Sequence, residues 1–176
     1  MPYILQHTAE AVDHKLNLID ENKNLLPYPY NYEPGLSAGF KDVGDGSILT
    51  LAKMDSESDI LLNTCMLPTG KKYALSISIT DITDATTVTN TDCKLRIITN
   101  DNKTVETASV DYLDLTAVTG DENGDVSAAV YLVIPKDFAK GLLIKPQIEE
   151  AVEGSPVAVW VPNMDKIGTY IDRRFN

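Results

Sequence analysis

The sequence is poor in the residues that bind polyanions or take part in catalysis. Of its 176 residues only 15 are Lys or Arg, against 26 Asp or Glu, and the formal net charge is -11. Because affinity for phosphate backbones comes from neutralising them with basic side chains, this balance argues against a nucleic acid as partner. Only two histidines occur, His7 and His14, and the motifs of a P-loop, a nucleophile elbow or a zinc protease are missing. We therefore predict no catalytic residues, no cofactor and no metal site, and hence a protein that is not an enzyme.

Long apolar segments are missing as well. The longest runs, such as residues 128–134, are far shorter than the roughly 18 residues that a membrane-spanning helix needs. Residues 1–7 have no basic stretch and only a very short apolar one, which is unlike a secretory signal. We therefore expect no membrane partner and a chain made in a cytoplasm, where Cys65 and Cys93 are buried, reduced thiols. A disulfide is the alternative.

Most of the chain consists of short strand-like segments and turns. Residues 73–80 alternate apolar and polar side chains, as in a strand with one face in a core. The dipeptide Asp45-Gly46 and residues 100–103 are both typical of hairpin turns. Eight or nine such strands without a helix of crossover length predict a mainly β protein, an antiparallel sandwich, and we expect the jelly-roll version. The predicted strands include residues 47–51, 60–66, 73–80, 95–99, 104–108, 126–134, 142–148 and 157–162.

Acidic residues are concentrated in the turn at residues 120–125, whose sequence is GDENGD. We expect a solvated hairpin tip there. A calcium site is the alternative, because hard cations prefer clustered oxygen ligands, although the spacing differs from that of an EF-hand loop. The many carboxylates elsewhere leave a glycosidase pair open by count alone, but the sequence singles out no such pair.

Helical periodicity is found near the N-terminus. Thr8 can cap a helix in which Val12, Leu16 and Ile19 recur at three- and four-residue steps and form a narrow apolar stripe. Such a stripe is typical of a coiled-coil seam and predicts a short stalk of two or three parallel copies, with a homotrimer favoured. Because so short a helix is marginal by itself, the alternative is that it packs on its own domain.

A segment rich in proline and tyrosine follows the helix at residues 24–35 and is expected to be a stiff, non-helical linker. Tyr28, Tyr30 and Tyr32 have near-alternating spacing and would project on one side. They either cover the edge of the following domain or form a partly exposed aromatic platform. Trp160 presents the same choice, because it lies opposite the valines of its predicted strand and is either sheet cover or an outward ring for stacking on a sugar.

Both ends of the chain resemble proteins of a known kind. The segments YILQHTAE (residues 3–10) and NLLPY (residues 24–28) resemble the openings of appendage proteins of tailed bacteriophages and prophages, the head fibres and the tail or baseplate fibres. The segments KPQIE (residues 145–149) and WVP (residues 160–162) resemble the last strands of the jelly-roll, carbohydrate-binding-module-like domains of those proteins. The turn at residues 150–153 looks longer than the tight turn usual in the family.

The resemblance implies a non-enzymatic structural protein located in the virion. We expect a short fibre, with the head favoured over the tail because the chain is short. It would display its jelly roll for interaction with the host surface. The alternative is a glycan-binding adhesion module of a tail or baseplate fibre. The expected partners are copies of the chain itself, capsid or other virion proteins and, for the alternative, bacterial surface glycans, with Tyr28, Tyr30, Tyr32 and Trp160 as the candidate sugar-binding residues.

The expected organisation has four parts. Residues 1–23 are the anchor and helical stalk, residues 24–35 the linker, residues 36–164 the jelly-roll sandwich and residues 165–176 a tail. Within the first part, residues 1–7 are apolar at Tyr3, Ile4 and Leu5 and are predicted to be the virion anchor, because short apolar segments often become ordered on a partner's sheet edge or groove. The alternative is that they pack back on their own stalk or sandwich, or are merely frayed.

Overall fold

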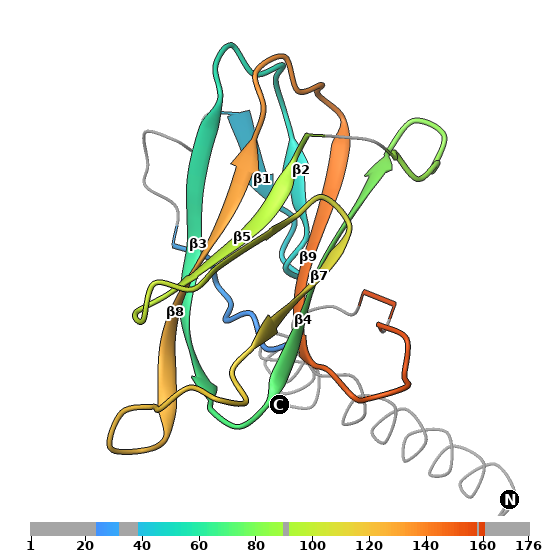
Figure 1. Ribbon diagram of the computed structural model, residues 1–176. Coiled ribbons are helices and arrows are strands. Elements are labelled where there is room, and N and C mark those ends of the chain that lie inside the picture. The colour runs from blue at the N-terminus through green and yellow to red at the C-terminus, as the bar shows by residue number, and fades with distance from the viewer. Residues whose placement is uncertain (1–23, 32–38, 90–91, 158, 161–176) are drawn as a thin grey trace, which may run out of the picture.

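The structure is a computed structural model that describes residues 24–31, 39–89, 92–157 and 159–160. These residues form two antiparallel sheets packed face to face, so the prediction of a mainly β antiparallel sandwich is confirmed (Figure 1). Several predicted features lie outside the described residues, namely the helix with Val12, Leu16 and Ile19, the anchor residues Tyr3, Ile4 and Leu5, Tyr32, and the tail at residues 165–176.

The two sheets contain five and four strands. The five-stranded sheet has, in spatial order, β1 (Phe40–Asp42), β2 (Ile48–Thr50), β9 (Leu142–Glu150), β4 (Lys72–Asp81) and β7 (Val110–Asp114). The four-stranded sheet has β3 (Ser58–Pro68), β8 (Asp125–Ile134), β5 (Lys94–Thr99) and β6 (Thr104–Thr107).

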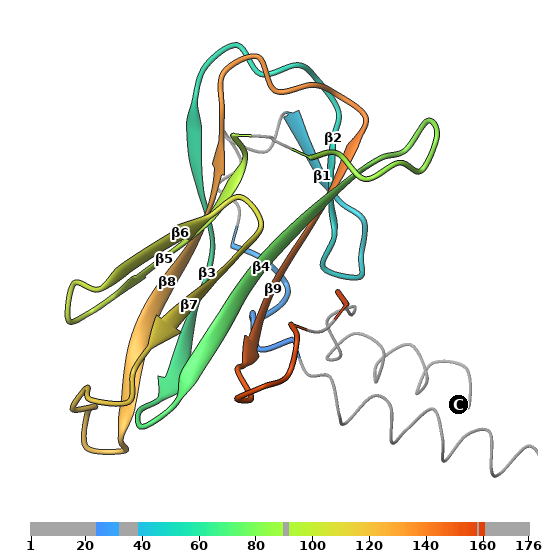
Figure 2. The ribbon, with the colours of Figure 1, turned by 45° about the vertical axis from the view of Figure 1, so that its right-hand side comes forward.

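The strands pair as if one long hairpin had been folded over itself. The inner pair is β5 with β6, followed outward by β4 with β7, β3 with β8 and β2 with β9, and all of these pairs are antiparallel. Successive pairs alternate between the two sheets, so every connection from β2 to β5 and from β6 to β9 crosses from one sheet to the other (Figure 2). The crossing connections therefore gather at the ends of the sandwich, where loops from distant parts of the sequence meet.

Alternation of buried and exposed residues explains most of the strands. In β5 and in most of β8 every second residue is buried, as expected for strands with one face in the core. Both predicted hairpin turns are confirmed, since Asp42 pairs with Ile48 across the first and Ile98 with Thr104 across the second. Gly46 in the first turn has a φ of 94°, a left-handed conformation that favours glycine.

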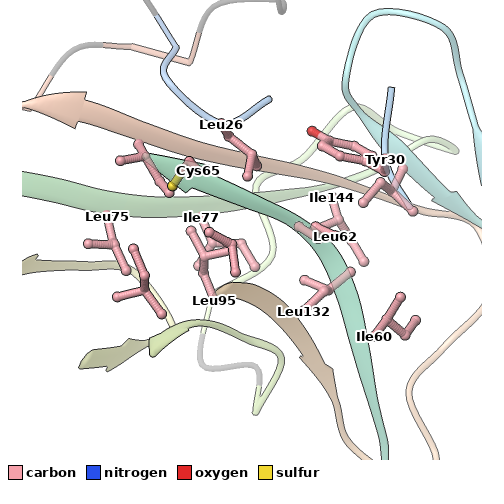
Figure 3. Packing of buried hydrophobic residues seen from close by; sticks show 14 of the residues in the cluster. Leu26, Tyr30, Ile60, Leu62, Cys65, Leu75, Ile77, Leu95, Leu132 and Ile144 are labelled. Carbon is pink, nitrogen blue, oxygen red and sulfur yellow. The ribbon is translucent and has the colours of Figure 1, made fainter. Parts of the chain in front are cut away.

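Leucine and isoleucine side chains from both sheets fill the space between them (Figure 3). Leu62, Leu75 and Leu95 are fully buried there, each contributing on the order of 1.5–3 kcal/mol. Cys65 and Cys93 are also buried and are not joined in a disulfide, so the prediction of reduced thiols is confirmed. Burial raises the pKa of Cys65 to about 11 and the pKa of Cys93 to about 12, which keeps both thiols protonated near neutral pH.

Three sequence-based expectations need correction. Val157, Val159 and Trp160 lie outside any strand, although residues 157–162 were expected to form one. The acidic turn at residues 120–125 connects β7 and β8, which belong to different sheets, so it lies on a crossing between the sheets rather than at the tip of a hairpin within one. The strand β7 was not expected, because Leu113 is its only buried residue and alternation is therefore absent.

Candidate functional site

Residues 24–31, here called the strap, are not a free linker but pack between the two sheets (Figure 1 and Figure 2). At one end the amide of Leu25 donates to the carbonyl of Ile148 in β9 at 2.7 Å. At the other end the amide of Asn31 donates to the carbonyl of Leu62 in β3 at 2.6 Å. The Nδ2 of Asn63 in β3 also donates to two strap carbonyls, at 3.3 and 3.0 Å. The strap therefore joins the five-stranded sheet to the four-stranded sheet.

Asn24 acts in place of a strand neighbour for β9. Pairing of β2 with β9 reaches only Ile144, and beyond it the buried side-chain amide of Asn24 bonds to the edge of β9 that β2 leaves unpaired. Its Oδ1 accepts from the amide of Ile148 at 3.2 Å and its Nδ2 donates to the carbonyl of Pro146 at 3.2 Å. Pro146 has no N–H to leave unpaired on this side, which suits its place in the strand. Because unpaired buried backbone groups are costly, these bonds stabilise the strap in this position.

The strap tyrosines are core residues. Tyr28 and Tyr30 are 6% and 9% exposed, and their rings meet edge to face with centroids 5.2 Å apart. The Tyr28 hydroxyl lies 2.7 and 2.6 Å from the carboxylate oxygens of Asp42, to which it donates, and the Tyr30 hydroxyl donates to the Gly46 carbonyl at 2.6 Å. Their faces are thus not open to a sugar. The alternative in which these tyrosines cover the edge of the domain describes both, and the exposed platform does not.

Trp160 is half-buried against β9. Its indole N–H donates to the carbonyl of Pro146 at 3.1 Å, and the Nζ of Lys145 lies over the ring, 5.5 Å from its centroid. A cation over an aromatic face is attracted by the ring quadrupole. One face of this indole is therefore already occupied, and a sugar would have to displace Lys145 to stack there.

A surface depression lies at one end of the five-stranded sheet and has a volume of about 660 Å³. Three segments that neighbour one another in the sheet form it: the start of β4, the strand β7 with the residues after it, and the loop that follows β9. The lining includes one aromatic residue, Tyr112, which is about half exposed. The lining residues are Gly70, Lys71, Lys72, Tyr112, Thr116, Glu150, Ala151, Val152, Glu153, Gly154 and Ser155.

Backbone hydrogen bonds hold these three segments together. The amide of Ala151 donates to the carbonyl of Lys72 and the amide of Leu115 donates to the carbonyl of Lys71, both at 2.9 Å. Farther along the loop, the amide of Ser155 donates to the carbonyl of Val152 at 3.0 Å, which closes a turn. The depression is therefore supported by an extension of the sheet rather than by one loop alone.

Both lysines of the depression are paired with carboxylates. Lys71 and Glu150 form an ion pair at 2.7 Å, and Lys72 and Asp114 form another at 3.3 Å. The hydroxyl and amide of Thr116 donate to Asp114 at 2.5 and 2.9 Å. These bonds from Thr116, followed by the interaction with Lys72, lower the pKa of Asp114 to about 2, so this carboxylate stays ionised at neutral pH.

A second charged cluster lies on the outward face of the four-stranded sheet. Glu106 accepts from Lys94 at 2.9 Å and from Arg96 at 2.5 Å, and Arg96 also donates to Asp59 at 2.5 Å. The hydrogen bond from Lys94, then the one from Arg96, lowers the pKa of Glu106. Each charge in this cluster faces an opposite one, so the arrangement is suited to joining β3, β5 and β6 rather than to catalysis.

Neither a metal centre nor a membrane span is found within the described ranges. No group of three or more His, Cys, Asp or Glu side chains there could hold a metal ion. In the acidic turn, the Oδ1 of Asp121 instead accepts from the amides of Asn123 and Asp125, at 2.9 and 3.0 Å. In the same part of the chain no helix is both long and apolar enough to cross a membrane.

No family model matches the chain, and no curated protein or solved structure matches it either.

Of the four candidate sugar-binding residues, the described ones lie near the strap and not at the depression. Tyr112 was not identified from the sequence, because nothing in VDYLD shows that it pairs with Ala74, two residues from Lys72 in β4. The signal in the sequence that could have identified Tyr112 is an aromatic residue in an acidic segment without apolar alternation.

Proposed function

We propose that the protein is a non-enzymatic structural protein of a tailed-bacteriophage virion, a short fibre with the head as the favoured site. The observation that carries this proposal is the strap. A segment bonded to β9 at one end and β3 at the other fixes the chain that precedes residue 24 to both sheets at once. A pull on residue 24 acts on the three hydrogen bonds that Asn24 and Leu25 form with β9, which is suitable for a domain held at the surface of a particle.

The order of the strands supports a jelly roll as the architecture of the displayed domain. Four nested antiparallel pairs that alternate between two sheets, with eight of the nine strands taking part, are the pattern of that fold. Jelly rolls occur in viral capsid proteins and in lectins, among others. One fold serves many functions, so the jelly roll supports the proposal together with the strap.

The N-terminal part of the proposal concerns residues outside the described ranges. Residues 1–7, with Tyr3, Ile4 and Leu5, are the proposed anchor, and Val12, Leu16 and Ile19 the proposed seam of a homotrimer. Light scattering on the purified chain should give a trimer mass, and charged substitutions at Leu16 and Ile19 should lower it. A strict monomer at high concentration would contradict the stalk.

The decisive experiment for the fibre is incorporation into particles. Virions from the bacteriophage or induced prophage that encodes the chain should contain the protein, detected by mass spectrometry and located by gold-labelled antibody in electron micrographs. Removing residues 1–7 should leave the sandwich folded but deplete the protein from particles, whereas Lys140→Ala, an exposed change between β8 and β9, should leave incorporation unchanged. Absence of the full-length protein from purified virions would refute the proposal.

The second candidate function is a glycan-binding adhesion module. The depression beside Tyr112 favours it, because small-molecule sites are concave, contain an apolar surface and carry a few polar groups that orient the ligand. A glycan array discriminates between the two candidates, since a fibre that serves only as a spacer or decoration binds none of the glycans.

A further inference from the structure

The depression at the end of the five-stranded sheet combines an exposed ring with groups that form hydrogen bonds. Tyr112 is 49% exposed and belongs to β7, the edge strand of its sheet. Its neighbour Val110, two residues earlier, is 42% exposed but does not line the depression. An amphipathic ring of this kind can lie against the apolar face of a ligand while polar groups around it contact the ligand's edge.

Charge around the ring disfavours an ionic ligand. The lining contains two cations, Lys71 and Lys72, and two anions, Glu150 and Glu153, so its formal charges cancel. Both ammonium groups are already paired with carboxylates, Lys71 with Glu150 and Lys72 with Asp114. An anionic ligand would have to compete with those carboxylates on a protein whose net charge is -11. The charge distribution therefore favours an uncharged ligand.

The polar groups of the lining suit a ligand with many hydroxyls. The Thr116 hydroxyl donates to Asp114, so its oxygen still has lone pairs with which to accept a hydrogen bond. The Glu153 carboxylate offers further acceptors, and the Lys71 ammonium has donors beyond the one used for Glu150. By contrast, the amides of Ala151 and Ser155 are engaged within the protein, which leaves fewer main-chain groups for an extended peptide.

We propose that the depression binds an uncharged saccharide, with one sugar ring stacked on Tyr112 and its hydroxyls bonded to Thr116 and the Lys71–Glu150 pair. The volume of about 660 Å³ lies within the range of about 300–1,000 Å³ typical of small-molecule sites. This inference rests on the adhesion function proposed as the second candidate. It places the site at the start of β4, at β7 and at the loop after β9, and the strap tyrosines and Trp160 are not among its lining residues.

Titration of the full-length chain, followed by amide resonances in two-dimensional NMR, tests the site. The probes are cellotriose, maltotriose and chitotriose, which are uncharged, and trigalacturonate as the acidic counterpart. At least one uncharged trisaccharide should shift the amide resonances of Tyr112, Thr116 and residues 151–155, and trigalacturonate should shift them less. The proposal is overturned if no uncharged trisaccharide shifts these amides or if the acidic trisaccharide binds as tightly. It is also overturned if the shifts cluster at Trp160, or if an extended peptide competes equally well for the depression.

Substitutions in β7 separate a binding role from a structural one. Tyr112→Ala should weaken binding at least tenfold, Tyr112→Phe should bind about as well as the parent because it keeps the ring, and Val110→Ala should match the parent. Unchanged affinity of Tyr112→Ala with a native-like spectrum would overturn the proposal. Detection of the parent protein in virions distinguishes failure of the sugar site from failure of the fibre, because the fibre proposal requires the parent in particles whether or not a sugar binds.

Discussion

On the strap side of the sandwich Leu26 and Tyr28 are buried in the core, whereas on the β7 side Val110 and Tyr112 are about half exposed. Strap contacts include main-chain bonds to both sheets and a buried side-chain amide, while the ion pairs near β7 are exposed to solvent. Exposed ion pairs contribute little to stability. The contacts of the strap side are therefore expected to contribute more to the free energy of unfolding than those of the β7 side. The strap side is built to hold the domain together, and the β7 side leaves side chains available for contact.

The largest effect is expected from Leu26→Ala on the strap side. Leu26 is fully buried in the core and packs beside residues of both sheets (Figure 3). Removing its side chain leaves a cavity and should lower the free energy of unfolding by about 2–5 kcal/mol, measured by chemical denaturation. The matched control is Leu51→Ala, since Leu51 is half exposed and its loss should cost less than about 0.5 kcal/mol. Equal effects at the two leucines would mean that the strap is not part of the core.

Thiol labelling should show whether the strap opens without the rest of the fold. Both thiols are buried and protonated, so alkylation of the native protein at neutral pH is expected to be slow. Cys65 belongs to β3, the strand that contacts the strap through Leu62 and Asn63, and Leu26→Ala should therefore speed labelling of Cys65 several-fold relative to Cys93. Mass spectrometry of the labelled peptides gives the two rates. Equal acceleration of both thiols would point to opening of the whole sandwich and against a strap that detaches locally.

Asn24→Ala is expected to have the next largest effect. The side chain accepts from Ile148 and Leu26 and donates to Pro146, so its removal leaves several backbone groups without these partners. Loss of a partner from a buried polar group costs about 1–3 kcal/mol, which urea denaturation can measure. Asn123→Ala in the exposed turn between β7 and β8 serves as the control and should change stability little. Stability of Asn24→Ala equal to that of the control would show that water replaces the amide.

Acid should weaken the fold, in part through Glu106. Hydrogen bonds from Lys94 and Arg96 hold the pKa of Glu106 below its ordinary value of 4.5. A carboxylate with a lowered pKa stabilises the folded state above its unfolded pKa and loses that contribution as the pH falls through its folded pKa. The free energy of unfolding should therefore decline below pH 4.5, and it should decline less steeply for Glu106→Gln. Glu122→Gln in the exposed acidic turn is the control, and an identical pH profile for all three proteins would contradict this assignment.

The sequence predicted the strands whose residues alternate and missed the parts that depend on distant contacts. β5 and most of β8 alternate and were anticipated, whereas β7 buries only Leu113 and was not. The strap was expected to be a linker, because its prolines exclude a helix and its tyrosines show only near-alternating spacing. Its position depends on hydrogen bonds to Ile148 and Leu62, which lie far away in the sequence, so no local pattern records it.

The candidate site was not predictable for the same reason. Tyr112 lies beside Lys72 and Glu150 through the pairing of β4 with both β7 and β9, and no local pattern records that register. The tyrosine spacing in the strap suggested a platform because near-alternation resembles a strand with one open face. A segment that lies between two sheets instead buries such residues, and the sequence alone does not distinguish the two situations.

The smallest effect on stability is expected from Tyr112→Ala on the β7 side. The ring is half exposed, and its loss should change the free energy of unfolding by no more than about 0.5 kcal/mol. Its neighbour Leu113 is buried, so Leu113→Ala is the matched contrast and should cost about 2–5 kcal/mol in the same denaturation experiment. A loss for Tyr112→Ala comparable with that of Leu113→Ala would mean that the ring packs as a core residue does. The β7 side would then serve stability as the strap side does, and Tyr112 would have no separate role in contact.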